Sequence, residues 1–167
     1  MSDRTLIELL YGKSAHANPL ACVKDVSFDL AGRRASNFRH STWQLVRHMS
    51  FWMDYELRRI RGDNPAYPAH AAESWPIEAA PANKDEWQKT IVHFEELLGK
   101  LAALAESTPE ELARDVQATY PDHLKHSSSL VAVLWQTLVH NSYHIGQIAM
   151  LRQALGAWPP KGGGDSW

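Results

Sequence analysis

The chain is predicted to be an all-α protein, a four-helix bundle formed by one domain. Residues 41–61, 83–105 and 128–155 are long, free of proline and carry apolar residues at helical spacing. Patterns typical of strands are almost absent. A chain of 167 residues is long enough to bury a substantial core as a single domain. We therefore expect residues 1–160 to form the bundle domain and residues 161–167 to form a flexible tail.

The first quarter of the chain is expected to be helical but broken. A helix is predicted over residues 2–14, where leucines mark an apolar face. Pro19, in a first helical position, can begin a further turn or two through Val26. Residues 31–39 are interpreted as a loop.

A long helix is predicted over residues 41–61. Ser41 is a suitable N-cap and Gly62 a suitable C′ residue, with apolar residues at spacings of three and four between them. Residues 63–81 contain four prolines and no periodic pattern. Long ordered connections in compact domains are often functional, but the sequence assigns no role to this one.

The helix predicted over residues 83–105 begins with a capping-box pattern. Its apolar residues alternate at spacings of four and three, which indicates the seam of an antiparallel bundle. Residues 108–111 are predicted to open a short helix, and residues 120–126 are interpreted as a loop. The last helix is predicted over residues 128–155 and ends before Gly156.

Composition excludes several classes of protein. The net charge is −2 and basic residues are scattered, so neither nucleic acid nor a membrane surface is an expected partner. No apolar run is long enough to span a membrane, and the first ten residues are not typical of a signal peptide, so a cytoplasmic location is expected. The one cysteine, Cys22, excludes an internal disulfide and a cysteine-rich zinc module. Any metal would be held by His, Asp or Glu.

Seven tryptophans are an unusually large number for this length. Core packing between helices is the simpler interpretation. Some of them could instead line a cavity, because aromatic walls are common in ligand pockets. Trp52, on the inward stripe of the helix over residues 41–61, is the candidate for such a role.

The segment His140-Asn-Ser-Tyr-His144 suggests a metal site. Residues four apart share one helix face, about 6 Å apart along the axis, and one divalent ion can bridge two such imidazoles. Pairs of this kind also arise by chance on exposed faces. His48 borders the apolar stripe of an earlier helix, where a lone histidine more often packs in the core. Together, however, the three would suit a catalytic zinc-like site with a fourth position left for water or substrate.

No general base is evident, and no catalytic residue is assigned. The pair lacks the glutamate of the HExxH motif of zinc proteases. The nearby polar candidates are Asn141, Tyr143, Gln147, Asp54 and Glu56. Gln147 is placed to hydrogen-bond His144, although polar packing inside the bundle is the alternative for both Gln147 and Tyr143.

Three segments resemble the DinB-like, or YfiT-like, metalloenzyme superfamily. They are Ser41-Thr-Trp-Gln-Leu-Val-Arg-His48, His140-Asn-Ser-Tyr-His144-Ile-Gly-Gln147 and the ending Leu155-Gly-Ala-Trp-Pro159. The resemblance covers essentially the whole chain in helix order and motif spacing. It implies a four-helix bundle that binds one divalent metal, zinc or nickel first among the candidates, through His48, His140 and His144.

The resemblance also implies an enzyme acting on a small molecule, and often a homodimer. Some members are described as metal-dependent hydrolases, and related branches are transferases or isomerases that use low-molecular-weight thiols. A metal could lower the pKa of bound water toward about 7, or it could bind and deprotonate a thiol. The sequence does not choose between these reactions. A non-catalytic metal- or ligand-binding bundle is the alternative, as is a set of histidines that only pack in the core.

Overall fold

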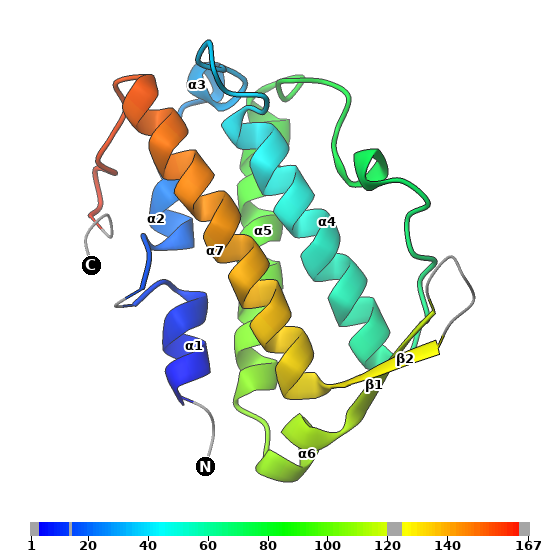
Figure 1. Cartoon of the computed structure of the whole chain (residues 1–167). Helices are drawn as coiled ribbons and strands as arrows, with labels where there is room; N and C mark the ends of the chain where they lie inside the picture. The colour runs from blue at the N-terminus through cyan, green and yellow to red at the C-terminus, as the bar shows by residue number, and fades with distance from the viewer. Residues whose placement is uncertain (1–3, 14, 120–124, 164–167) are drawn as a thin grey trace.

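The protein is a four-helix bundle, as predicted. The computed structural model describes residues 4–13, 15–119 and 125–163. Its three long helices are α4 (Thr42–Arg61), α5 (Lys84–Ala105) and α7 (Leu130–Ala154) (Figure 1). Two short helices, α1 (Arg4–Leu10) and α2 (Pro19–Lys24), together take the fourth place, since both contact α5 and α7.

The first helix is shorter than predicted. Of the helix predicted over residues 2–14, residues 2, 3 and 14 lie outside the described part, and α1 ends at Leu10. Gly12 follows with a φ of 83°, a left-handed conformation that ends a helix and favours glycine. The chain becomes helical again at Pro19, where the Asn18 side chain accepts hydrogen bonds from the first free backbone N–H groups.

The caps predicted for the second long helix are confirmed. The Ser41 hydroxyl accepts from Gln44 N while the Gln44 side chain accepts from Ser41 N, which is a complete capping box. Gly62, with a φ of 91°, ends α4 in the left-handed conformation. A short helix capped by Ser27, α3 (Phe28–Ala31), was not predicted before the loop.

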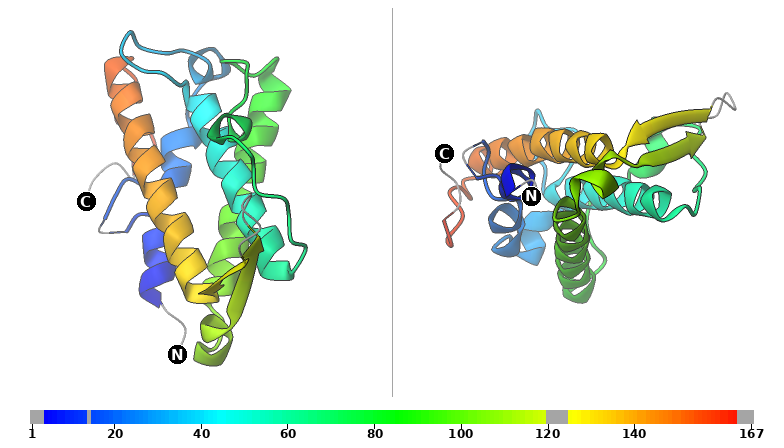
Figure 2. Two further views of the ribbon diagram at one scale, coloured as in Figure 1. Left: turned by 45° about the vertical axis from the view of Figure 1, so that its right-hand side comes forward. Right: turned by 90° about the horizontal axis from the view of Figure 1, so that it is seen from below.

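The long helices do not all alternate in direction. Figures 1 and 2 show α4 and α5 running in the same direction, with α7 antiparallel to both. The prediction of an antiparallel bundle is therefore wrong for the pair α4 and α5. A helix of 20 residues is about 30 Å long, so the connection over residues 62–83 must return the chain along the bundle. This return explains its length, and it contains one 3-10 helix, η1 (Ala71–Ser74).

A small hairpin corrects the prediction of a loop at residues 120–126. After the predicted short helix, α6 (Pro109–Ala113), strand β1 (Asp115–Thr119) pairs antiparallel with β2 (Lys125–Ser129). Residues 120–124 lie outside the described part, but Lys125 and His126 belong to β2. The serine-rich sequence of β2 has little intrinsic preference for a strand. The hairpin instead depends on contacts of β1 and β2 with α7, and of β1 with α4, under which Val116 is buried.

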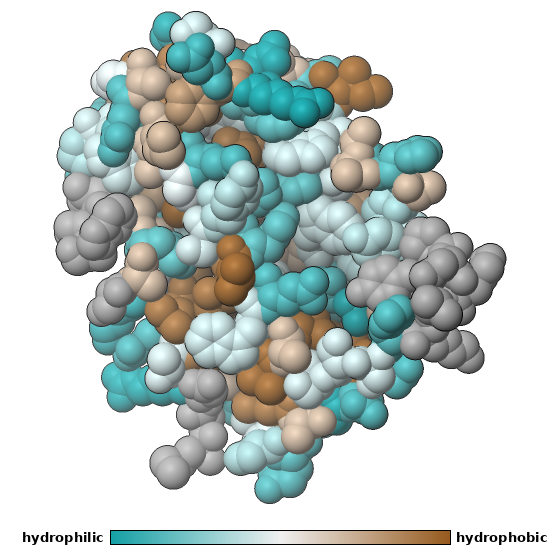
Figure 3. All heavy atoms as spheres, in the orientation of Figure 1, coloured by the Kyte–Doolittle hydropathy of each residue, from teal (hydrophilic) through white to brown (hydrophobic). Residues whose placement is uncertain are grey.

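The core lies between the long helices and holds α4 against α7. Its largest fully buried side chains include Met49, Met53, Phe94, Leu97, Leu98, Leu101, Ile145 and Ile148. The outer face over α4 and α7 mixes hydrophilic and hydrophobic residues, with the hydrophobic ones densest in the lower half of the view (Figure 3). Among the described helices, none has the length and apolarity that crossing a membrane requires.

Candidate metal centre

Three histidines from two helices converge in the bundle. The Nε2 atoms of His140 and His48 are 3.2 Å apart, and those of His144 and His140 are 3.1 Å apart. One nitrogen from each ring lies within 4.8 Å of the other two. His48 and His144 are buried and His140 is half-buried. The structure thus brings together the three residues that the sequence singled out as metal ligands.

The helices explain the convergence. His140 and His144 stand one turn apart on the same face of α7, as their spacing predicts. His48 lies on α4, which packs along α7 in the opposite direction. The buried apolar face of α4, which includes Leu45, Met49 and Met53, sets the rotation of the helix and so aims His48 at the α7 pair.

Hydrogen bonds orient two of the three rings. His48 Nδ1 donates to the Ser74 carbonyl oxygen at 3.3 Å, and His144 Nδ1 donates to Gln147 Oε1 at 2.7 Å. These oxygens only accept, so the Nε2 atoms of both rings carry bare lone pairs. His140 can donate from Nε2 to one of them but not to both. At least one nitrogen–nitrogen contact is therefore without a hydrogen bond, and a cation would stabilise it.

The donor set fits a divalent metal. Nitrogens bound at 2.0–2.1 Å to a tetrahedral ion lie about 3.3 Å apart, close to the two spacings in the cluster. Imidazole is a ligand that suits zinc, nickel, copper and iron. The acceptors on His48 and His144 are typical of metal-binding histidines, whose second nitrogen usually donates to an oxygen.

The rings are held in the neutral form that metal binding requires. Burial, reinforced by the neighbouring histidines, lowers the pKa of His48 to about 3. Burial and the charge of His144 also lower the pKa of His140 to about 4, against an opposing effect of the adjacent Asn141 amide. Burial lowers the pKa of His144, which the hydrogen bond with Gln147 partly offsets. Each of the three rings is accordingly neutral at neutral pH and has one nitrogen lone pair to offer a metal.

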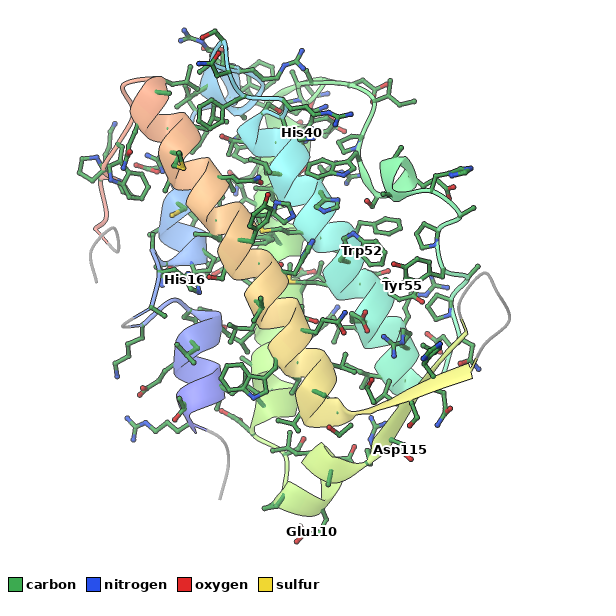
Figure 4. All side chains as sticks on the ribbon, in the orientation of Figure 1. His16, His40, Trp52, Tyr55, Glu110 and Asp115 are labelled. Carbon is green, nitrogen blue, oxygen red and sulfur yellow. The ribbon has the colours of Figure 1, made fainter. Side chains whose placement is uncertain are left out.

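The long connection covers one side of the cluster. The Trp75 ring stacks on His48 with centroids 3.7 Å apart and an interplanar angle of 6°. On its other face Trp75 stacks on His40, again at 3.7 Å, and it meets the edge of His144 at 5.7 Å. His40 lies at the beginning of α4 (Figure 4). Together with the Ser74 carbonyl, Trp75 gives the connection a role that the sequence left unassigned.

Comparison with known families agrees with this geometry. The model of the DinB superfamily matches residues 14–148. The chain belongs to the DinB superfamily. The matched residues include His48 on α4 and both His140 and His144 on α7.

A solved structure supports the fold of this DinB-superfamily protein. YfiT from Bacillus subtilis, described as a probable metal-dependent hydrolase with an unusual four-helix bundle topology, aligns with a TM-score of 0.64 and 21% identity. The alignment covers 93% of this chain and 87% of YfiT. At this identity the likeness supports the fold rather than the reaction. No curated protein matches the chain significantly.

The other candidate residues of this DinB-superfamily protein lie at different distances from the cluster. Gln147 accepts a hydrogen bond from His144, which is a member of the cluster. Asn141 is buried next to His140, while Tyr143 is 66% exposed and meets His144 only with its ring. Trp52 lines a pocket that opens beside His140, and Figure 4 shows it in the middle of α4 on the side of the connection.

Several residues around the centre were missed from the sequence. They are His40, Ser74 and Trp75 next to the cluster, and Tyr55, Arg59, Tyr67, Gln136 and Thr137 in the pocket. The unusual length of the connection and its tryptophan were the available signals. His16 is not part of the centre. It lies between α1 and α2 (Figure 4), where its ring nitrogens approach backbone carbonyl oxygens.

Proposed function

We propose that this protein is a metal-dependent enzyme that acts on a small molecule. His48, His140 and His144 would hold one divalent ion, with zinc or nickel as the leading candidates. The observation that carries this proposal is the convergence of three neutral imidazole nitrogens, two of them oriented by oxygens on the far side of the ring. Oriented lone pairs of this kind have no role in ordinary core packing.

An open coordination position favours an enzyme over a structural metal site. Structural zinc sites are usually closed by four protein ligands. Among the described residues, the group of metal-ligating side chains contains only the three histidines. A pocket of about 270 Å³ adjoins His140, so a small molecule can approach that side of the cluster. A non-catalytic metal- or ligand-binding bundle is therefore the second candidate.

Hydrolysis is the leading reaction class, since the structurally similar YfiT is described as a probable metal-dependent hydrolase. When bound, the metal would supply a Lewis acid that activates either water or a thiol. The protein contributes the orientation of His48 and His144 and the wall that Trp75 builds against the rings. Transfer of a low-molecular-weight thiol is the alternative reaction. It is supported by the lack of a carboxylate within the described histidine group.

Metal analysis of tag-free protein, purified without added metal, tests the proposal. We expect about one equivalent of a divalent metal per chain, lost in His48→Ala and retained in His93→Ala, an exposed histidine on α5. Circular dichroism of each variant checks that the bundle is folded. Binding of less than a stoichiometric amount, unchanged by His48→Ala, would refute the metal centre.

An activity screen then separates the reaction classes. The metal-loaded protein is assayed with an esterase and amidase panel, and in parallel with low-molecular-weight thiols and electrophilic substrates. Turnover of esters or amides that is lost in His48→Ala supports the hydrolase. Turnover that requires a thiol supports the transferase, and activity in neither screen supports the non-catalytic bundle. The homodimer implied by the family resemblance stays a prediction, which sedimentation velocity tests.

A further inference from the structure

The pocket beside His140 extends away from the histidines between α4 and α7. It has a volume of about 270 Å³, near the lower end of the range for small-molecule sites. Its lining residues are Trp52, Tyr55, Glu56 and Arg59 from α4, Gln136, Thr137 and His140 from α7, and Tyr67 from the connection. Glu56 lies eight residues after His48, which corresponds to about 12 Å of helix axis. The pocket therefore reaches from His140, the member of the histidine cluster among its lining residues, along α4 to Glu56 and Arg59.

A buried ion pair forms the opposite end. Arg59 Nη1 donates to Glu56 Oε2 at 2.6 Å, and the side chains are only 6% and 11% exposed. Arg59 Nε also donates to the Gln117 carbonyl oxygen of β1 at 3.2 Å. Burying two charges is costly, and removing them from water is rarely favourable for stability alone. Stability alone therefore does not account for the position of this pair on the pocket wall.

The pair keeps hydrogen-bonding capacity for a ligand. Among the described residues, no hydrogen bond uses Glu56 Oε1 or Arg59 Nη2. Neither atom belongs to the fully buried polar atoms without a partner. Both residues line the pocket, so a small molecule that enters it can approach the free carboxylate oxygen and the free guanidinium N–H groups. One acceptor and one set of donors thus stand side by side.

The aromatic residues form a wall along the pocket. The Trp52 ring lies 5.4 Å from Tyr55 and 5.5 Å from Tyr67, and the two tyrosine rings are 5.9 Å apart. At these spacings the three rings pack on one another in tilted or edge-to-face contacts. They leave no space between them for a cation, so they are not an aromatic cage for an ammonium group. Their faces suit an apolar chain or a flat group in the middle of a ligand.

We propose that the pocket binds an elongated small molecule whose far end is an amino-acid-type group, with its ammonium on Glu56 and its carboxylate on Arg59. The inference rests on the proposed function for the near end only, where a metal-binding group of the ligand would reach the histidine cluster. A ligand end with one charge would be attracted by one member of the pair and repelled by the other. A dipolar end satisfies both, and charge-assisted hydrogen bonds make the recognition specific.

A series of thiols tests the far end without altering the protein. The probes are 2-amino-8-sulfanyloctanoate, 8-sulfanyloctanoate and 7-sulfanylheptylamine, which differ only in carrying both charges, the carboxylate or the ammonium. Their Kd values are measured by isothermal titration calorimetry with metal-loaded protein. We expect the dipolar probe to bind at least about tenfold more tightly than either analogue. Equal affinities, or no binding of the dipolar probe, would overturn the inference.

The same measurement with 2-aminooctanoate, octanoate and heptylamine, which lack the thiol, separates the inference from the metal centre. A dipolar preference that persists in this series without metal dependence would support the ion-pair site and count against the metal-binding end. A metal-loaded protein that binds all three thiols equally would leave the proposed function intact and refute only the far-end recognition.

Variants then assign the recognition to the pair. Removing one charge can leave the other buried and unpaired, so the double variant Glu56→Gln/Arg59→Gln is compared with the single ones. In a folded double variant the dipolar probe should lose its advantage of about tenfold. Arg58→Gln, an exposed arginine on the same helix, is the matched control and should retain it. If the pair only anchors β1, the folded double variant will bind all probes as the unaltered protein does.

Discussion

Replacing Gln147 by leucine tests how the hydrogen bond behind His144 supports the metal centre. Gln147 Oε1 lies 2.7 Å from His144 Nδ1 and holds the ring with its Nε2 toward the other two histidines. Leucine is similar in size and is a good helix former, so Gln147→Leu removes the acceptor with little effect on α7. The ring then loses both the oxygen that selects its tautomer and the partner that fixes its orientation.

The expected effect is large enough to measure directly. Loss of such an oxygen partner typically weakens metal binding by about 10- to 100-fold. This range corresponds to about 1.4–2.7 kcal/mol of binding free energy. Gln147→Glu keeps an acceptor at the same place and makes it anionic, so it should bind the metal at least as tightly as the unaltered protein.

Competition with a chromophoric chelator at neutral pH gives the dissociation constants. Gln153→Leu, an exposed glutamine on the same helix, is the matched control and should bind as the unaltered protein does. If Gln147→Leu binds metal within about twofold of the unaltered protein, the hydrogen bond does not support the centre. A loss of affinity in Gln147→Glu equal to that in Gln147→Leu would also refute the reasoning.

Three further predictions concern stability. The metal-free protein should become less stable as the pH falls from about 6.5 toward 4. The folded state lowers the pKa of His48 to about 3 and of His140 to about 4, whereas the histidines of the unfolded chain take up protons near pH 6.5. Urea unfolding at several pH values measures the free energy of unfolding, and a flat profile would contradict this prediction. Asp25→Asn should cost about 2–3 kcal/mol, since it leaves the buried Arg152 guanidinium without its carboxylate partner; a change below about 0.5 kcal/mol in the same assay would show that the pair is not important. Phe94→Ala should destabilise the bundle by about 3–5 kcal/mol, since the ring is fully buried between the helices. Urea unfolding measures this loss, and a loss below about 1 kcal/mol would contradict the prediction.

The helices and their ends could be predicted because the forces that form them are local. Ser41 and Gly62 flank α4 as a cap and a left-handed C′ residue, and each acts within one turn of the chain. The alternation of apolar residues likewise records which face of a helix is buried. The same logic put His140 and His144 on one face of α7 before any packing was known.

Local reasoning failed where a segment depends on distant partners. The hairpin of β1 and β2 has a weak strand pattern, and its strands are held by each other and by α4 and α7. The direction of α5 relative to α4 could not be predicted from the sequence either, because parallel and antiparallel packing bury the same apolar stripe. Only the route of the connection over residues 62–83 decides between them.

The sequence by itself determined the helical class, the long helices and the pair of histidines on α7, since periodicity and capping act over a few residues. His48 stands 92 residues before His140. Its place beside the apolar stripe of residues 41–61 made it a candidate ligand, and the family resemblance supported that assignment. The tertiary structure alone decided that the three Nε2 atoms meet and that Trp75 stacks on His48 while the Ser74 carbonyl accepts its hydrogen bond. It also decided that Glu56 and Arg59 line the pocket beside His140. These contacts depend on how separate elements pack against one another, and no local pattern in the chain records that packing.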